Sequence, residues 1–218
     1  MNEAKKILVI APHADDEILG CGGYLLHEIS NGVVVYIMIA TVGNDTASQD
    51  MVVRLDELRQ VSVMLGINRY TVGFMNKDAT LESVPIKNIV GWIDSAIDEI
   101  RPDEVLVNYS SHHQDHKHLY NAAMASLRLK DGFMPKFVAL YEYPFVNGIL
   151  TSIDGGRWYH DISDVISDKV ELFKLYKSQN KQAPSPLNED GIKALARIRG
   201  LESGCEYAEL FYIQKLIR

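Results

Sequence analysis

The chain has 218 residues, of which 47% are hydrophobic and 23% are charged, and its formal net charge is −7. This apolar content argues against a disordered chain, and the acidic balance argues against nucleic acid or an anionic membrane as the main partner. Two cysteines, Cys21 and Cys205, do not make a disulfide framework in a chain of this length. We therefore expect both thiols to be reduced and buried, in a cytoplasmic protein.

The length suits one domain that covers residues 1–218. Residues 1–6 are too few and too charged for the start of a signal peptide, and the apolar run after them is too short for its core. No apolar run approaches the roughly 20 residues that span a bilayer. The sequence therefore predicts a protein without a membrane segment.

The first predicted strand covers residues 6–11, where KILVIA is a continuous apolar run of the kind that is buried on both faces of a sheet. Apolar residues at helical spacing then predict a helix over residues 17–30, which ends at the Asn31-Gly32 pair. The same patterns predict further strands over residues 33–40, 70–74, 104–109 and 137–143, and further helices over residues 51–66, 84–100, 118–128 and 191–203.

Two stretches near the C-terminus are less regular. Residues 177–190 are polar and contain two prolines, which predicts a surface loop, and residues 209–216 suit either a strand or a helix. The alternation of strands and helices along the chain implies βαβ units. The expected fold class is therefore α/β, a Rossmann-like three-layer fold with a mainly parallel sheet flanked by helices.

Three glycines, Gly20, Gly22 and Gly23, follow the first predicted strand and allow a dinucleotide-binding site to be considered. They lie inside the predicted helix, about one turn too late to surround a phosphate, and the G-x-G-x-x-G spacing is absent. We interpret them instead as positions where the helix packs closely on the sheet.

Two polar clusters follow strands of the predicted parallel sheet. The first is HADDE at residues 13–17, and the second is HHQDHKH at residues 112–118. In an open parallel sheet, ligands bind beyond the carboxyl ends of the strands, so both clusters are placed where a site is expected. Neutral imidazole and carboxylate groups are good ligands for zinc and similar divalent ions.

The spacing within the first cluster suggests a division of roles. His13 and Asp16 are three residues apart and would face the same way on a first helical turn, and a third ligand from the second cluster would leave one tetrahedral position open for water. Asp15 would then sit beside that water and could take its proton. Each cluster alone has a simpler explanation, since Asp15 or Asp16 could be a helix N-cap and the histidines a solvated loop. The two clusters together favour a metal site.

Both motifs resemble those of a known family. HADDE resembles the His-Pro-Asp-Asp-Glu signature of the PIG-L/LmbE-like zinc-dependent N-deacetylases, and residues 113–116 resemble its His-x-Asp-His signature. Arg54 with Glu57 resembles the Arg-x-x-Glu that opens the family's second helix. Residues 199–211 resemble the family's C-terminal ending, most strongly that of the bacillithiol-biosynthesis deacetylases.

The resemblance implies a role for each residue of the first motif. His13 and Asp16, together with His116 of the second motif, would be the zinc ligands, and Asp15 would be the general base. Glu17 would support the loop by hydrogen bonds and would not touch the metal. Where the family usually has proline, this chain has Ala14, which removes no ligand.

The resemblance also implies roles outside the ligand set. His113 would polarise the acyl carbonyl or stabilise the oxyanion, and it could protonate the leaving amine. Asp115 would orient a histidine, and Arg54 would reach the substrate. His113 is preferred to His112 because only His113 keeps the His-x-Asp-His spacing. His118 is expected on the following helix, in a structural or surface position.

The expected activity is hydrolysis of an acetamide on an N-acetylglucosamine-type sugar, with no nucleic acid or membrane partner. Zinc is the implied cofactor, but two histidines and one carboxylate also suit ferrous iron. Alternatives are hydrolysis of another acyl or carbamoyl amide, or a metal- or sugar-binding module without turnover. The loops expected to choose the substrate are residues 41–49, 144–158 and 177–190. Assembly into a homo-oligomer is left open.

Overall fold

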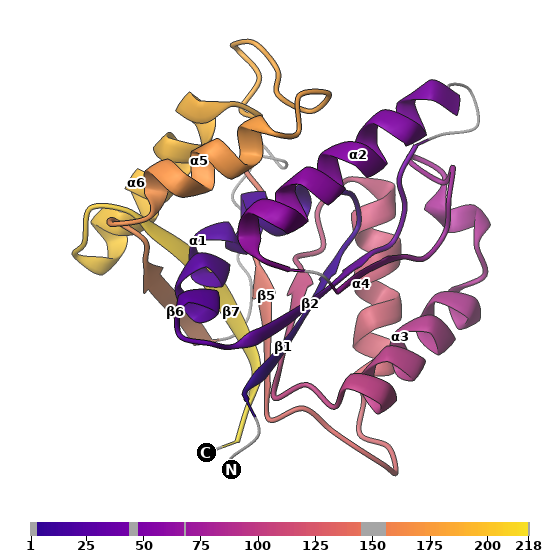
Figure 1. Cartoon of the computed structure of the whole chain (residues 1–218). Coiled ribbons are helices and arrows are strands. Elements are labelled where there is room, and N and C mark those ends of the chain that lie inside the picture. The colour runs from indigo at the N-terminus through magenta and orange to yellow at the C-terminus, as the bar shows by residue number, and fades with distance from the viewer. Residues whose placement is uncertain (1–3, 44–47, 68, 145–155, 218) are drawn as a thin grey trace.

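The computed structural model describes residues 4–43, 48–67, 69–144 and 156–217. These residues form a seven-stranded sheet with the strand order β3-β2-β1-β4-β5-β7-β6 (Figure 1). The strands are β1 (Lys6–Ala11), β2 (Val34–Ile39), β3 (Tyr70–Val72), β4 (Glu104–Asn108), β5 (Phe137–Tyr141), β6 (Gly156–Asp161) and β7 (Ala208–Leu216).

The sheet is mainly parallel, as expected from the alternation of strands and helices. β1 pairs in parallel with β2 and β4, β2 with β3, and β4 with β5. β7 then runs antiparallel to both β5 and β6, which gives the sheet one antiparallel edge. Residues 209–216, left open as a strand or a helix, are therefore a strand that lies inside the sheet.

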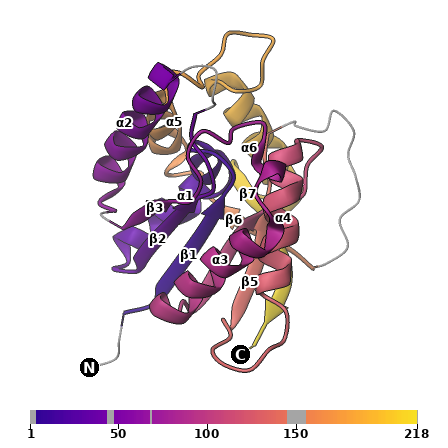
Figure 2. The ribbon, with the colours of Figure 1, turned by 90° about the vertical axis from the view of Figure 1, so that its right-hand side faces the viewer.

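Helices cover both faces of the sheet, so the predicted three-layer α/β architecture is confirmed (Figures 1 and 2). One layer holds α1, α2, α5 and α6, and the other holds α3 and α4 after a short 3-10 turn, η1. Their bounds are α1 (Asp16–Ser30), α2 (Ser48–Leu65), η1 (Leu81–Ser83), α3 (Ile86–Ile100), α4 (Gln114–Ser126), α5 (Ile166–Lys174) and α6 (Glu189–Ser203).

The central strand β1 separates two hydrophobic cores. Ile7 and Val9 point into the core under α1 and α2, whereas Leu8 and Ile10 point into the core under α3 and α4. This alternation follows from the two-residue period of a strand, and it explains why the run is apolar without interruption. Burial of each such side chain stabilises the fold by about 1.5–3 kcal/mol.

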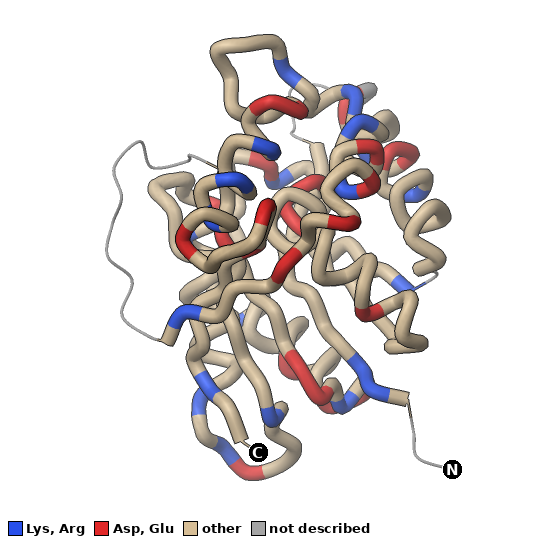
Figure 3. The backbone as a smooth tube through the Cα atoms, turned by 90° about the vertical axis from the view of Figure 1, so that its left-hand side faces the viewer, with Lys and Arg blue, Asp and Glu red and all other residues tan. Residues whose placement is uncertain are grey.

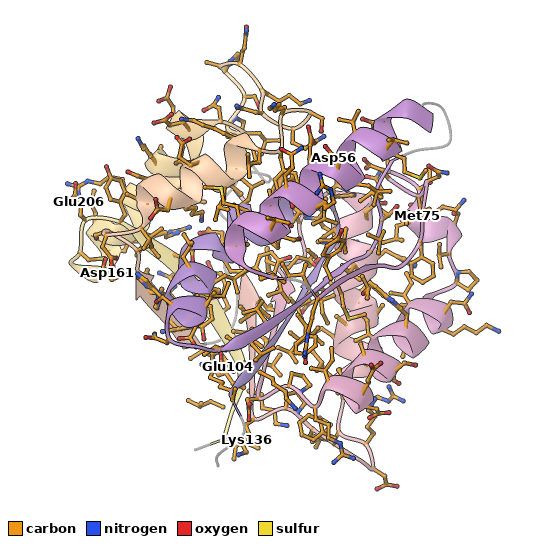
Figure 4. The ribbon with its side chains drawn as sticks, viewed as in Figure 1. Asp56, Met75, Glu104, Lys136, Asp161 and Glu206 are labelled. Atoms are coloured by element: carbon orange, nitrogen blue, oxygen red, sulfur yellow. The ribbon has the colours of Figure 1, made fainter. Side chains whose placement is uncertain are left out.

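The parallel strands give the sheet two different ends. Glu104, the first residue of β4, and Lys136, just before β5, lie toward the end that also carries both chain termini (Figures 1 and 4). The carboxyl ends of β1, β2, β3, β4 and β5 therefore meet at the opposite end, where residues 13–17 and 111–116 follow their strands.

Two of the three glycines after β1, Gly20 and Gly23, lie where α1 packs closely on its neighbours. A Cβ added at Gly20 would lie 2.0 Å from the ring of Tyr141 on β5, and one added at Gly23 would lie 2.5 Å from Ile162. Helix α1 therefore approaches the sheet and the β6–α5 connection more closely than any side chain would allow.

Some sequence-based expectations were wrong. β6 and α5 were not predicted, and α4 begins at Gln114, four residues before the expected start, because His113 caps it. Within residues 177–190, α6 already begins at Glu189, where the Asn188 side chain accepts the Gly191 amide at 3.0 Å. Both cysteines are free, but only Cys21 is buried, and Cys205 is half-exposed.

Charged residues of both signs are distributed along the chain. On the face that Figure 3 shows, Lys and Arg segments lie among Asp and Glu segments. No helix within the described ranges is both long and apolar enough to cross a membrane.

Candidate active site

Three ligand atoms from two segments, residues 13–16 and the first turn of α4, converge at the carboxyl end of the sheet. His13 Nδ1 and His116 Nε2 each lie 3.3 Å from Asp16 Oδ2, and all three side chains are buried. A tetrahedral ion with bonds of about 2.0–2.1 Å has ligand atoms roughly 3.3 Å apart. The separations therefore fit a zinc-sized ion, and the structure brings together the residues that the sequence motifs singled out.

Local structure fixes the positions of these three residues. Asp16 is the first residue of α1, and its Oδ2 accepts the backbone N–H of His13 at 3.0 Å, so the two residues hold each other. His116 lies in the first turn of α4, and its carbonyl accepts the side-chain amide of Asn108 at 3.0 Å. That bond ties the start of α4 to the end of β4.

Asp115 is the hydrogen-bond partner of His13 on the side of the ring away from Asp16. His13 Nε2 lies 2.9 Å from Asp115 Oδ2, whose carboxylate also accepts the backbone N–H groups of Ala79 at 2.7 Å and Leu81 at 3.0 Å. Burial opposes this charge, but these hydrogen bonds lower the pKa of Asp115. A carboxylate that receives the Nε2 proton leaves the Nδ1 lone pair free for the cluster.

The cluster favours a positive charge at its centre. Burial alone would lower the pKa of His13, but hydrogen bonds to Asp115 and Asp16 and nearby carboxylates raise it to about 10. Burial would likewise raise the pKa of Asp16, but His116 and His13 lower it far below the ordinary range. A bound divalent cation would replace the positive charge that protonated His13 carries in the metal-free protein.

Asp15 is buried beside the cluster in an unusual backbone conformation. Its φ of 135° and ψ of −30° lie in a region where residues other than glycine are strained. Backbone strain of this kind is common at functional sites. Its backbone N–H donates to Glu17 Oε2 at 3.0 Å, and the Tyr176 hydroxyl donates to Glu17 Oε1. Burial and the charge of Asp16 raise the pKa of Asp15 well above its usual value, whereas Arg54 opposes the rise.

His113 is the N-cap of α4. Its Nδ1 accepts the backbone N–H of Asp115 at 3.2 Å, so the proton of the neutral ring is assigned to Nε2. Burial and the neighbouring rings of His13 and His116 lower the pKa of His113, which favours this neutral form. A neutral ring with a proton on Nε2 is a hydrogen-bond donor at the edge of the cluster.

Of the other histidines in this run, neither joins the three-ligand cluster. His118 Nε2 lies 3.0 Å from the carbonyl of Val84, so His118 connects α4 to the segment before α3. His112 is exposed, and it is His113 whose ring lies 5.1 Å from that of His13.

Glu57 accepts hydrogen bonds from the backbone N–H and the hydroxyl of Ser178, which connects α2 to the loop after α5.

Arg54 faces the cluster from α2. Its side chain is only 7% exposed, and its Nη1 pairs with Asp78. Its Nε is buried and has no hydrogen-bond partner among the described residues. Buried N–H groups are normally paired, so this position suits a group that arrives with a ligand.

Two further residues lie at the site and were not predicted from the sequence. Asp78 Oδ1 lies 3.3 Å from His13 Nε2, and the ring of Tyr143 lies 4.9 Å from that of His116 at an angle of 82°. Each follows a parallel strand, β3 or β5, at its carboxyl end. The same rule that drew attention to the two clusters could have found them, but each is an isolated polar residue in the chain. Of the three loops expected to choose the substrate, residues 44–47 and 145–155 lie outside the described residues.

The fold and the buried imidazole and carboxylate cluster define an α/β protein with a candidate metal centre at the carboxyl end of its sheet. Residues 8–127, more than half of the chain, match the family described as PIG-L, GlcNAc-PI de-N-acetylase. The chain belongs to this family, as its motifs predicted, and the expected enzyme class, an N-deacetylase among the hydrolases, is confirmed.

Known relatives carry deacetylase names. The diacetylchitobiose deacetylase of Thermococcus kodakarensis is 25% identical over 95% of this chain and 82% of its own length. A probable N-acetyl-alpha-D-glucosaminyl L-malate deacetylase 2 of Bacillus cereus is 24% identical over 81% of this chain and 84% of its own. The solved N,N'-diacetylchitobiose deacetylase of Pyrococcus horikoshii has the same fold, with a TM-score of 0.78 at 22% identity over 97% of this chain and 84% of its own.

Proposed function

We propose that the protein is a zinc-dependent hydrolase that removes the acetyl group from an N-acetylglucosamine-type amino sugar. The observation that carries the proposal is the convergence of His13, Asp16 and His116 beside the buried Asp15. The deacetylase names of the relatives support the reaction, and the N-acetylglucosaminyl and chitobiose parts of those names support the sugar. The candidate substrates within this class are a thiol-precursor glycoside, a nucleotide-linked sugar, a chitooligosaccharide fragment and an antibiotic intermediate.

The ligand atoms would be His13 Nδ1, Asp16 Oδ2 and His116 Nε2. An ion held there would act as a Lewis acid toward the acyl carbonyl and would acidify a water molecule. Zinc suits this donor set, and ferrous iron also binds two histidines and one carboxylate, so the metal is to be measured in protein from cells grown without added zinc.

The residues around the ion would share the proton transfers. The carboxylate of Asp15 accepts a proton from the attacking water, and the positive charge of Arg54 favours its ionised form. The Nε2 proton of His113 stabilises the negative charge that develops on the acyl oxygen. The C–N bond then breaks as the amine takes from Asp15 the proton that Asp15 accepted from water, and the products are acetate and the free amino sugar.

Arg54 is proposed to contact the substrate through its Nε, which has no partner among the residues that the structure describes. Asp78 holds the other side of the guanidinium through Nη1, so the group is fixed before a ligand arrives. A fixed donor that lacks a partner among the described residues suits a sugar hydroxyl or a carboxylate of a conjugate.

We also propose that residues 1–218 form one domain, because the two hydrophobic cores lie on opposite faces of one sheet.

Acetate release from a panel of N-acetylglucosamine derivatives tests this function. The zinc-loaded protein should release acetate from at least one of them. Release of another acid or of carbamate, with no acetate, would favour the alternative amidohydrolase. A protein that holds metal and sugar but hydrolyses no amide would be a binding module, and the proposed function would then be wrong.

A further inference from the structure

Helix α1, which carries Asp16 and Glu17, is bent in its middle. Cys21 has φ −141° and ψ 17°, which are not helical, so Asp16–Gly20 and the residues after Cys21 are two helical segments with different directions. Single bends of this kind have identifiable causes, such as a side chain that inserts into the ladder of backbone hydrogen bonds.

Two charged side chains lie at the bend. Glu209 of β7 accepts the backbone N–H of Gly23 through Oε1 and that of Tyr24 through Oε2, each at 2.8 Å. Lys169 of α5 donates to the carbonyl of Leu19 at 2.8 Å and to Glu209 Oε1 at 2.7 Å. In a regular helix, the Gly23 amide and the Leu19 carbonyl would bond to each other.

The two charges match the ends of the two segments. The cation of Lys169 lies at the C-terminal end of the first segment, and the carboxylate of Glu209 lies at the N-terminal end of the second. These are the signs that the helix dipole favours at each end. Both side chains are almost fully buried, 4% and 3% exposed, so their mutual pairing and these backbone bonds are what offset the loss of water.

The first segment is a single turn whose far end Lys169 holds. At its near end, the Asp15 carbonyl accepts the backbone N–H groups of Ile18 and Leu19 at 3.1 and 2.9 Å. A turn this short has almost no stability of its own, because helix nucleation is unfavourable. Its direction therefore depends on contacts from outside, and α5 lies beside α1 on the same face of the sheet (Figure 1).

We propose that Lys169 and Glu209 are positioning residues for the metal centre. By holding the bend of α1, they set the direction of its first turn. That turn places Asp15 and Asp16 against His116 of α4, the helix on the opposite face of the sheet. Neither residue contacts the cluster itself. The part of this proposal that concerns turnover depends on the proposed deacetylase function, whereas the part that concerns metal binding does not.

The test compares Lys169→Met and Glu209→Gln with Lys130→Met. Lys130 forms a partly buried ion pair with Asp94 at 2.6 Å on the opposite face of the sheet, so Lys130→Met controls for the loss of an ion pair. Zinc affinity is measured by competition with a chelator, and kcat and KM are measured well below each variant's Tm. Hydrogen exchange of the amides of residues 16–24 is measured on the metal-free proteins.

We expect both bend variants to bind zinc at least tenfold more weakly and to lose at least tenfold in kcat with KM nearly unchanged. Their amides in residues 16–24 should exchange faster, while those of α3 stay protected. Lys130→Met should have a lower Tm without these changes.

Zinc affinity and kcat within twofold of wild type in Glu209→Gln, with a lowered Tm, would overturn the proposal. If Lys169→Met does not fold, Glu209→Gln decides alone, since Gln keeps the shape and an acceptor oxygen. If wild type releases no acetate, zinc affinity and hydrogen exchange still decide.

Discussion

His13 Nε2 lies 2.9 Å from Asp115 Oδ2, and on the other side of the same ring Nδ1 lies 3.3 Å from Asp16 Oδ2. One imidazole thus connects a carboxylate that is anchored by two backbone amides to the cluster that is proposed to hold the ion. Carboxylates in this position fix the tautomer and the direction of a ligating histidine. We therefore propose that the orientation of the candidate metal centre depends on Asp115, a residue of the second motif that is not itself a proposed ligand.

Substitution Asp115→Asn should weaken zinc binding about 10- to 100-fold, because the amide is a poorer acceptor for the His13 proton. Competition with a chelator at fixed pH measures this change. The exposed Asp164→Asn is the control and should leave zinc affinity unchanged. Wild-type affinity in Asp115→Asn would show that Asp115 does not orient His13.

Zinc affinity should rise with pH. In the metal-free protein, hydrogen bonds to Asp115 and Asp16 overcome burial and raise the pKa of His13 to about 10, so zinc must displace a proton below that pH. Affinity should therefore increase up to about tenfold per pH unit across neutral pH. The sign for stability is opposite. Because the folded pKa exceeds the unfolded one, the stabilisation of the metal-free protein by charged His13 is complete below about pH 6.5 and is lost as pH rises toward 10.

Chelator competition at pH 6.5, 7.5 and 8.5 in a single buffer system checks this pH dependence. The free zinc concentration is set with the chelator's own pH correction. An affinity for zinc that does not change over this range would mean that His13 carries no proton in the metal-free site, and the predicted pH dependence would be wrong.

Substitution Tyr176→Phe should destabilise the fold by about 1–3 kcal/mol, because it removes a hydrogen bond to the buried Glu17 carboxylate and keeps the shape of the ring. Burial already raises the pKa of Glu17 to about 7, so losing this donor should raise it further. Urea unfolding at pH 8 measures the difference in free energy. A change below about 0.5 kcal/mol would mean that the hydroxyl does not stabilise Glu17.

Substitution Gly20→Ala should destabilise the protein by about 1–3 kcal/mol, because the new Cβ would lie 2.0 Å from the Tyr141 ring. The matched control is Gly91→Ala in α3, where a Cβ meets nothing within 4 Å. That change should stabilise the helix by about 0.5–1 kcal/mol. Thermal unfolding of both variants gives opposite shifts in Tm if the close packing is as described, and the same sign would contradict it.

Much of this structure could be predicted from the sequence because its strongest signals are local. The uninterrupted apolar run of β1 identifies a central strand, and the rule for the carboxyl ends of parallel strands drew attention to residues 13–17 and 112–118 together. The His-x-Asp-His motif, whose two histidines are three residues apart, pointed to His113 instead of the adjacent His112. In the described structure the ring of His113 lies beside that of His13.

What was missed depends on contacts between distant residues. β6 is a half-exposed edge strand whose sequence, GRWYHD, has no alternating pattern, and α5 is only nine residues long with a buried lysine at its centre. Lys169 and Glu209 are 40 residues apart and meet only because β7 lies inside the sheet. Asp78 likewise lies close to His13 only because the segment after β3 ends beside the cluster, so no local sequence motif indicates its position.

We propose that His13, Asp16 and His116 hold the ion and that Asp15 acts beside it on water. The most direct measurement is zinc content and acetate release in Asp15→Asn, with Asp16→Asn as the comparison. Asp15→Asn should keep close to one zinc per chain and lose about 10²–10⁴-fold in kcat, whereas Asp16→Asn should lose the zinc as well. Undiminished acetate release by Asp15→Asn, or undiminished zinc in Asp16→Asn, would contradict the account.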